Sequence, residues 1–255
     1  MKISVSNLSF LGPHFESMRN LPPEMGIEIF LEFGTDYYWD KSLPKVMAGR
    51  TGGLSMHGPF RDVNLAADCD EKPLLEYFKW SFERYKKYNG EFLVIHTNAA
   101  VGAEEKDRAG MKQRSKERIA KLAGIAKDNG IVLAVENMGY GAQGGLLFDC
   151  EEFIGIFDEI RDIRCLIDVG HAFIEKWDTE ALVKRLAGRI VAFHLHDSQG
   201  ELDEHLKIGA GKFDWPRFFK ACRHFAPDAT MVLEYNHAEI VDIIAGAAVI
   251  KTMFA

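Results

Sequence analysis

The chain reads Ile190-Val191-Ala192-Phe193-His194-Leu195-His196-Asp197 at the point that decides its fold. An apolar, β-branched run that breaks into His-X-His-Asp predicts a buried strand with two imidazoles at its carboxyl end. A polar loop follows, with a second ligand-like pair, Asp203 and His205, and then Gly209 and Gly211. Imidazole and carboxylate together are typical ligands of zinc, manganese and related divalent ions. The alternative is two surface histidines followed by an ordinary loop.

Strand-like and helical patterns alternate on both sides of this stretch. Apolar runs predict eight strands, at residues 2–10, 26–33, 54–59, 91–98, 131–135, 165–168, 190–195 and 230–236. Helical spacing predicts helices at residues 14–19, 42–49, 72–89, 104–129, 149 onward, 179–187, 215–225 and 238–254. No linker or composition shift divides the 255 residues. The alternation therefore predicts an α/β fold with one domain over residues 1–255, a single (β/α)8 TIM barrel of eight parallel strands with outer helices.

Composition and charge limit the classes of function. The content of 47% hydrophobic and 27% charged residues is ordinary for a soluble globular protein. A formal net charge of −7 weighs against nucleic acid as a partner, because phosphate binding needs a cationic face. Four cysteines without a Cys-X-X-Cys pair favour neither disulfides nor a thiolate zinc site. No apolar run approaches membrane-spanning length and no signal peptide precedes the first strand, so we expect a cytoplasmic protein without a membrane partner.

Polar side chains end most of the predicted strands or follow them closely. In a (β/α)8 barrel these strand ends share one face, where the chemistry takes place. The residues collected on that face are His57, His96, Glu136, Asp168, His171, His194, Asp203, His205 and Glu234. Any one of them alone is explained by a hydrogen bond to a loop. Their conjunction is not, because carboxylates that converge in a barrel mouth repel one another and lose hydration unless a cation compensates them.

Four of these residues are well separated along the chain and suit one metal site. Glu136, Asp168, His194 and Glu234 would form an oxygen-rich centre with positions left for a substrate. Such mixed ligands are compatible with manganese, magnesium, cobalt or zinc. The sequence therefore predicts a divalent metal ion as cofactor.

The combined motifs resemble the xylose-isomerase-like superfamily, which holds sugar and sugar-phosphate isomerases and epimerases, inosose-type enzymes and endonuclease IV. The motifs are Glu136-Asn137, Asp168-X-X-His171, His194-Leu-His-Asp197, Asp203-X-His205 with Gly209-X-Gly211, and Glu234. The resemblance spans nearly the whole chain. It implies a metal-dependent isomerase or epimerase whose substrate is a sugar, a sugar phosphate or a related polyol or keto acid.

For the isomerases and epimerases of this superfamily, the resemblance implies roles for individual residues. The four metal ligands would hold one ion, which stabilises an enediolate formed by proton transfer. Glu136 and Glu234 would be the two acid/base groups. His171 and His205 would orient substrate hydroxyls, and the loop 209–211 would offer backbone N–H groups to a hydroxyl or a phosphate.

Endonuclease IV is the rival interpretation. The nine polar residues match every ligand position of its three zinc ions, which would make the protein a zinc phosphodiesterase acting on abasic DNA. The chain departs from that family at Tyr37, where an arginine is expected, and at Phe60, where a tyrosine is expected. Together with the acidic net charge, these differences favour the isomerase or epimerase. A third alternative is a barrel that binds sugar or metal without turnover.

Three aromatic residues in a row, Tyr37, Tyr38 and Trp39, follow the second predicted strand. We expect them in a loop, with Trp39 as a lid over the substrate. The alternative is that they cap the fold or form the interface of a homo-oligomer.

Overall fold

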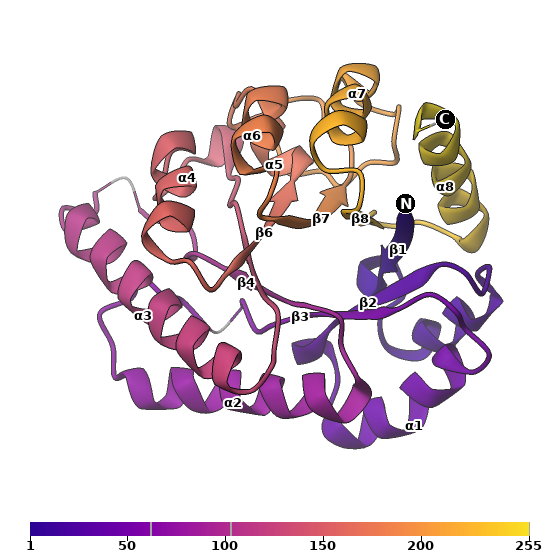
Figure 1. Cartoon of the computed structure of the whole chain (residues 1–255), viewed down its shortest axis with the longest axis horizontal. Helices are drawn as coiled ribbons and strands as arrows, with labels where there is room; N and C mark the ends of the chain where they lie inside the picture. Colours follow the sequence, from indigo (N-terminus) through magenta and orange to yellow (C-terminus); the bar gives the residue numbers. More distant parts are fainter. Residues whose placement is uncertain (62, 103, 255) are drawn as a thin grey trace.

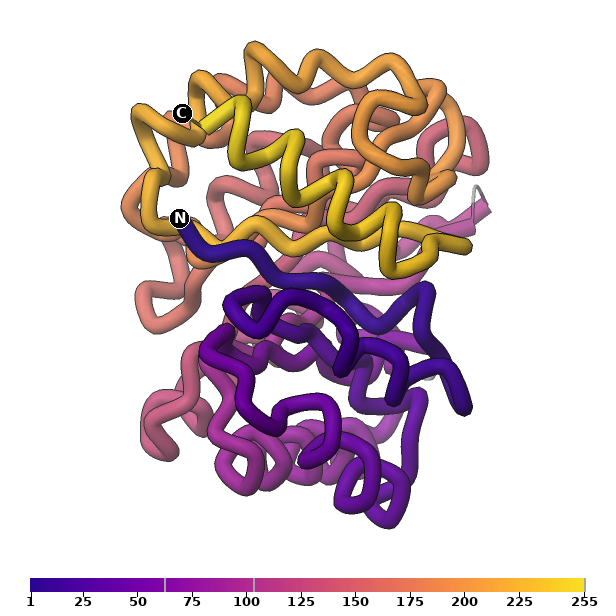
Figure 2. Tube along the Cα trace, turned by 90° about the vertical axis from the view of Figure 1, so that its right-hand side faces the viewer, coloured from indigo at the N-terminus to yellow at the C-terminus, as the bar shows by residue number. Residues whose placement is uncertain are grey.

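The computed structural model describes residues 1–61, 63–102 and 104–254. Eight parallel strands form a closed barrel in sequence order, and β8 pairs with β1 to close it. The strands are β1 (Lys2–Ser6), β2 (Gly26–Phe30), β3 (Leu54–His57), β4 (Leu93–His96), β5 (Leu133–Glu136), β6 (Arg164–Asp168), β7 (Ile190–Leu195) and β8 (Thr230–Leu233). Figure 1 shows them as an inner ring with helices around it, and Figure 2 shows both chain ends on one side of the molecule. The predicted (β/α)8 barrel is confirmed.

Helices connect successive strands along the outside of the barrel. The α-helices are α1 (Asp36–Met47), α2 (Glu71–Tyr88), α3 (Arg108–Asp128), α4 (Cys150–Glu159), α5 (Val169–Ile174), α6 (Thr179–Leu186), α7 (Trp215–Phe225) and α8 (Ile240–Phe254). Short 3-10 segments are η1 (Asn7–Ser9), η2 (Gly12–Asn20), η3 (Leu31–Phe33) and η4 (Gly141–Gln143).

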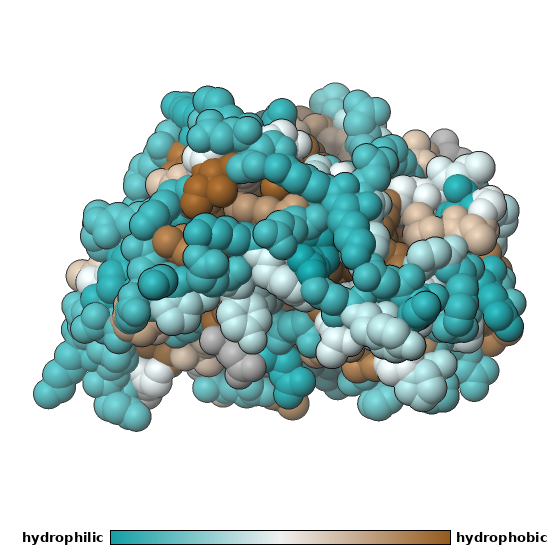
Figure 3. Space-filling model, turned by 90° about the horizontal axis from the view of Figure 1, so that it is seen from below, coloured by the Kyte–Doolittle hydropathy of each residue, from teal (hydrophilic) through white to brown (hydrophobic). Residues whose placement is uncertain are grey.

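Seen from the side of α1 and α2, the surface is mostly hydrophilic with small separate apolar patches (Figure 3). Among the described residues, none of the helices combines the length and apolar character needed to cross a bilayer.

The prediction of a strict alternation between one strand and one helix is wrong in two places. The first connection is the 3-10 segment η2, which starts at a glycine with φ of 56° followed by Pro13, and which lacks a side-chain cap. The sixth connection contains two helices, α5 and α6. Several strands also end earlier than predicted. β3 stops at His57, because Pro59 has no N–H with which to extend the hydrogen-bonded ladder.

The pleat of the strands explains how the polar residues come to face the barrel interior. Side chains two residues apart lie on the same face of a strand. Six buried apolar side chains form a cluster of their own on the β4 to β8 side of the barrel: Phe92, Val94, Ala134, Leu166, Ala192 and Val232. The residues two positions after the last five are His96, Glu136, Asp168, His194 and Glu234. The apolar layer therefore forms the floor under a polar layer at the carboxyl end.

The parallel register brings these strand ends side by side. His96 is the Cα partner of Glu136 across β4 and β5, and Asp168 is the partner of His194 across β6 and β7. His57 lies opposite Phe30 across β2 and β3. Residues far apart in the sequence thus meet at one end of the barrel.

The structure corrects the expectation that Trp39 is a substrate lid. Thr35 caps α1, and its Oγ1 accepts a hydrogen bond from the Tyr38 backbone N–H, so the three aromatics begin a helix. Trp39 is fully buried, its Nε1–H donates to the Leu31 carbonyl over 2.9 Å, and its ring packs edge-on against Phe15. Trp39 is therefore part of the core between α1 and η2.

We predict that Trp39→Ala destabilises the protein, because it removes a large buried ring from the core. The free energy of unfolding should fall by about 3–5 kcal/mol. Urea denaturation followed by circular dichroism measures this loss. Tyr37→Ala is the matched control, because Tyr37 is 73% exposed and its replacement should change stability by less than about 0.5 kcal/mol. An unaltered unfolding midpoint for Trp39→Ala would contradict the core assignment.

Candidate active site

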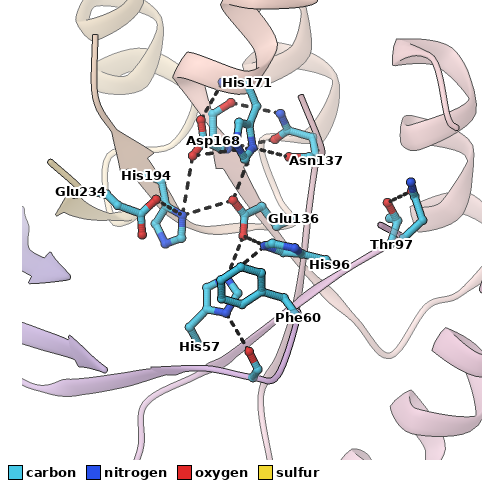
Figure 4. A network of polar contacts seen from close by, with 12 residues as sticks. His57, Phe60, His96, Thr97, Glu136, Asn137, Asp168, His171, His194 and Glu234 are labelled. Atoms are coloured by element: carbon cyan, nitrogen blue, oxygen red, sulfur yellow. Dashed lines mark hydrogen bonds and ion pairs between the residues drawn. The ribbon is translucent and has the colours of Figure 1, made fainter. Parts of the chain in front are cut away.

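His194 lies at the centre of the polar layer. Its Nδ1 is 3.2 Å from Glu136 Oε1, 3.3 Å from Glu234 Oε2 and 3.8 Å from Asp168 Oδ2. Figure 4 shows the three carboxylates arranged around this ring nitrogen. All four residues are buried. The structure thus brings together the four residues that the sequence singles out as one metal site.

A fourth acidic residue beside His194, Glu28 of β2, is one that the sequence alone did not single out. It is fully buried, its Oε1 lies 2.7 Å from His194 Nε2, and its Oε2 accepts a hydrogen bond from Ser55 Oγ. A carboxylate accepts hydrogen bonds, so this contact places a proton on Nε2 and leaves Nδ1 facing the other three carboxylates. A signal was present, because a glutamate inside the apolar run Gly26–Phe30 is a buried charge that needs a partner.

Electrostatic effects of burial are strong in this layer. Burial opposes ionisation of Glu136, yet the imidazoles of His194 and His96 hold its pKa well below the usual value. Burial raises the pKa of Glu234. For His194 burial disfavours the charged ring, but Glu234 and Glu136 raise its pKa well above that of a free imidazole. The carboxylates therefore draw positive charge into the site.

The donor set fits a divalent cation. Glu234 Oε1 and Asp203 Oδ1 are buried oxygens that have no hydrogen-bond partner within the described part of the chain. Such oxygens are costly unless a donor or a cation satisfies them. The carboxylates and imidazoles present are the ligand types that hold manganese, zinc, cobalt and magnesium in proteins.

A second cluster lies beside Glu136. His57 Nε2 is 3.1 Å from His96 Nε2 and 3.3 Å from Glu136 Oε2. His57 Nδ1 lies 2.9 Å from the Gly58 carbonyl, to which it donates its proton. The donation leaves Nε2 as the nitrogen that faces the cluster.

A third cluster is built around Asp203 in the loop after β7. Its Oδ2 lies 3.3 Å from His171 Nε2 and 3.1 Å from His205 Nε2. The Nδ1 atoms of the two rings face the backbone carbonyls of Asn137 and Glu234 at 2.9 and 3.0 Å. All nine predicted site residues therefore lie at one end of the barrel.

Asp168 is held by contacts from three sides. The Asn137 carboxamide connects β5 to β6. Its Nδ2–H donates to the backbone carbonyl of Asp168, and its Oδ1 accepts from the backbone N–H of Asp168. Asp168 Oδ1 also caps α5, accepting from the His171 N–H. His196 Nε2 lies 2.9 Å from the same oxygen, and its ring stacks on His205 with centroids 3.9 Å apart. These contacts give His196 and Asn137 a positioning role.

Asp197, the last residue of the opening stretch, holds the loop that carries Asp203. Its carboxylate accepts from the N–H groups of Gly209 and Phe213 and from Trp215 Nε1. A Cβ on Gly211 would lie 2.3 Å from Asp197 Oδ1, which explains the second glycine. The expectation that loop 209–211 offers backbone N–H groups to a substrate is corrected for two of its residues, because the Gly209 N–H is donated to Asp197 and the Ala210 N–H to the Lys207 carbonyl.

A cavity of about 510 Å³ opens above the polar layer. Seven of the nine predicted residues line it, while Asp168 and His194 lie beneath as buried floor. The cavity is also lined by residues that the sequence does not single out for this role, including Phe30, Phe60, Asn98, Tyr140, Gln143 and Asn236. Loop residues such as Tyr140 carry no periodic signal, so only the folded chain places them.

A closed (β/α)8 barrel with imidazoles and carboxylates gathered at the carboxyl ends of its strands defines the class of this protein. Residues 26–253 match the family model described as xylose isomerase-like TIM barrel, and the chain belongs to this family. The resemblance recognised in the sequence is thereby confirmed.

Similar proteins extend this result. The uncharacterized protein MJ1614 of Methanocaldococcus jannaschii is 26% identical over 194 residues, which cover 74% of this chain and 72% of that protein. A D-tagatose 3-epimerase-like protein superposes with a TM-score of 0.81 at 21% identity, over 99% of this chain and 97% of that one. An AP endonuclease of family 2 from Brucella melitensis superposes with a TM-score of 0.78 at 17% identity, over 99% of both chains. At these identities the solved structures establish the shared fold alone.

We predict that Gly170→Ala displaces His196 and loosens Asp168. A Cβ at residue 170 would lie 2.0 Å from His196 Cε1, so the ring has to move. Loss of such a supporting contact typically costs about 10–100-fold in metal affinity. Titration calorimetry with Mn²⁺ measures the change.

Gly155→Ala in α4 is the control, because its Cβ would meet nothing within 4 Å. That variant should bind Mn²⁺ as the original protein does. Equal Mn²⁺ affinity of the Gly170 and Gly155 variants would show that His196 does not support Asp168.

Proposed function

We propose that the protein is a divalent-metal-dependent isomerase or epimerase that acts on a sugar or a related polyol or keto acid. The observation that carries the proposal is the convergence of Glu136 and Glu234 on His194 Nδ1, at 3.2 and 3.3 Å, at the floor of the cavity. Two carboxylates close to one centre are what a proton transfer needs when one group removes the proton and another returns it. The fold shared with an epimerase-like protein is compatible with this choice.

Glu136, Asp168, His194 and Glu234 are the residues that would hold the ion, with manganese, zinc, cobalt and magnesium as candidates. When bound, a divalent ion polarises a carbonyl oxygen and so makes the neighbouring C–H more acidic. The Glu28 carboxylate keeps His194 Nδ1 directed at this centre from the other side of the ring.

The chain itself supplies the proton transfer in this proposal. Glu136 and Glu234 come from β5 and from the end of β8, so they approach the centre from different sides of the barrel. One removes a proton from the carbon beside the carbonyl, and the other delivers a proton to complete the isomerisation or epimerisation. His171 and His205, fixed through their Nδ1 atoms, orient substrate hydroxyls.

A zinc phosphodiesterase acting on abasic DNA is the second candidate. The two additional clusters favour it, since His57 with His96 and His171 with His205 each present a pair of Nε2 atoms to a carboxylate. Such pairs are suited to further zinc ions. The number of ions bound therefore separates the two candidates.

We predict about one divalent ion per chain in protein purified without a histidine tag. Elemental analysis by mass spectrometry measures the stoichiometry directly. The four-residue centre accounts for one ion, and the remaining histidines then act on the substrate. Two or three zinc ions per chain would favour the phosphodiesterase, and cleavage of an abasic DNA duplex would be the next assay.

We predict that Glu136→Gln lowers kcat by at least about 10³-fold while the barrel stays folded, because the change keeps the volume and removes the acid/base group. Circular dichroism and metal content are measured alongside activity. Glu83→Gln is the control, since the Glu83 side chain is 72% exposed on α2 and should leave activity unchanged. Retained turnover in Glu136→Gln would remove this residue from the mechanism.

A further inference from the structure

We propose that the substrate is an uncharged sugar or polyol rather than a sugar phosphate, an inference that rests on the proposed function. The described residues that line the cavity include three carboxylates, Glu136, Asp203 and Glu234, but neither lysine nor arginine. A dianionic phosphate placed in this cavity would lose hydration without gaining a lysine or arginine partner, the side chains that commonly bind phosphate. The lining therefore disfavours phosphorylated substrates.

The loops after β7 and β8 give independent support. In (β/α)8 barrels these loops commonly form a phosphate site from backbone N–H groups. Here six of these N–H groups are already donated within the protein: Gly209 and Phe213 to Asp197, Ile208 to Tyr235 Oη, Ala210 to the Lys207 carbonyl, Lys212 to the Ser198 carbonyl and Asn236 to the His205 carbonyl. A phosphate would have to compete for donors that are engaged.

The two imidazoles nearest to these loops are engaged as well. His171 and His205 each direct Nδ1 at a backbone carbonyl and Nε2 at the single oxygen Asp203 Oδ2. All four ring nitrogens thus have partners inside the protein. A substrate hydroxyl can add to such a network by accepting and donating at once, whereas a phosphate brings only acceptor oxygens and further negative charge next to Asp203.

Arg61 is adjacent in sequence to the cavity-lining Phe60, yet it serves a different surface. Its guanidinium lies over the Phe33 ring, 6.0 Å from the centroid. It lines a separate cavity of about 740 Å³ together with Tyr77 and Trp80. The lining of the site instead offers neutral polar groups, namely the carboxamides of Gln143 and Asn236, which suit sugar hydroxyls.

Matched pairs of substrates test the inference. D-tagatose, D-fructose and their 6-phosphate esters are compared on the full chain loaded with Mn²⁺, by kcat/KM and by calorimetric binding. We expect kcat/KM for the free sugar to exceed that for its ester by at least about 100-fold, because like charges in a partly desolvated site repel strongly. An ester that is turned over or bound as well as the free sugar would overturn the inference and leave the proposed function intact. Cleavage of an abasic DNA duplex without turnover of any sugar would overturn both.

A variant pair makes the test sharper. Gln143 is exposed in the cavity wall, so Gln143→Lys places a cation where the lining has none, and Gln143→Met is the uncharged control of similar length. We expect kcat/KM for the phosphate ester to be about 10-fold higher in the Lys variant than in the Met variant, with a smaller difference for the free sugar. An equal response of ester and free sugar would show that missing cationic charge does not determine the choice of substrate.

Discussion

The contact between His194 and its surrounding carboxylates is the interaction on which the site depends. Buried carboxylates that share one region repel each other and lose hydration, and the resulting cost grows as water is excluded. His194 compensates part of this cost by facing Glu28 with one ring nitrogen and Glu136, Asp168 and Glu234 with the other. The remaining cost, visible in an unpaired Glu234 oxygen, is what a divalent cation would relieve. Binding of a cation would therefore also stabilise the folded arrangement of these buried carboxylates, because it reduces their mutual repulsion.

The barrel provides this arrangement through the regular geometry of its strands. A period of two along the strands puts an apolar side chain beneath five of the polar ones, as with Ala134 and Glu136 or Ala192 and His194. The apolar layer excludes water from below and keeps the polar layer at the cavity floor. The same pleat therefore serves both the stability of the barrel and the position of the chemistry.

The sequence predicts the barrel and its ring of polar strand ends well, because both follow from local periodicity that survives in the fold. It fails where a residue's role depends on a partner from a distant element. Trp39 belongs to a run of aromatics, and only packing against Phe15 shows that it is core. Glu28 looks like an interruption in a strand until His194 is placed 2.7 Å away. Gly170 is required by the ring of His196 in the next strand's loop, a contact that no spacing rule contains.

Ligand count alone is a poor guide to the reaction in this family, since the same nine positions are compatible with one ion or with three. A more informative feature is which protein groups already accept hydrogen bonds from the donors around the site. In this chain Asp203 Oδ2 contacts the Nε2 atoms of His171 and His205. The Asp197 carboxylate accepts hydrogen bonds from N–H groups of the following loop. Both aspartates therefore satisfy internally the donors that an anionic substrate would require. The proposed preference for a neutral substrate therefore rests on how these donors are engaged and on the charge of the lining.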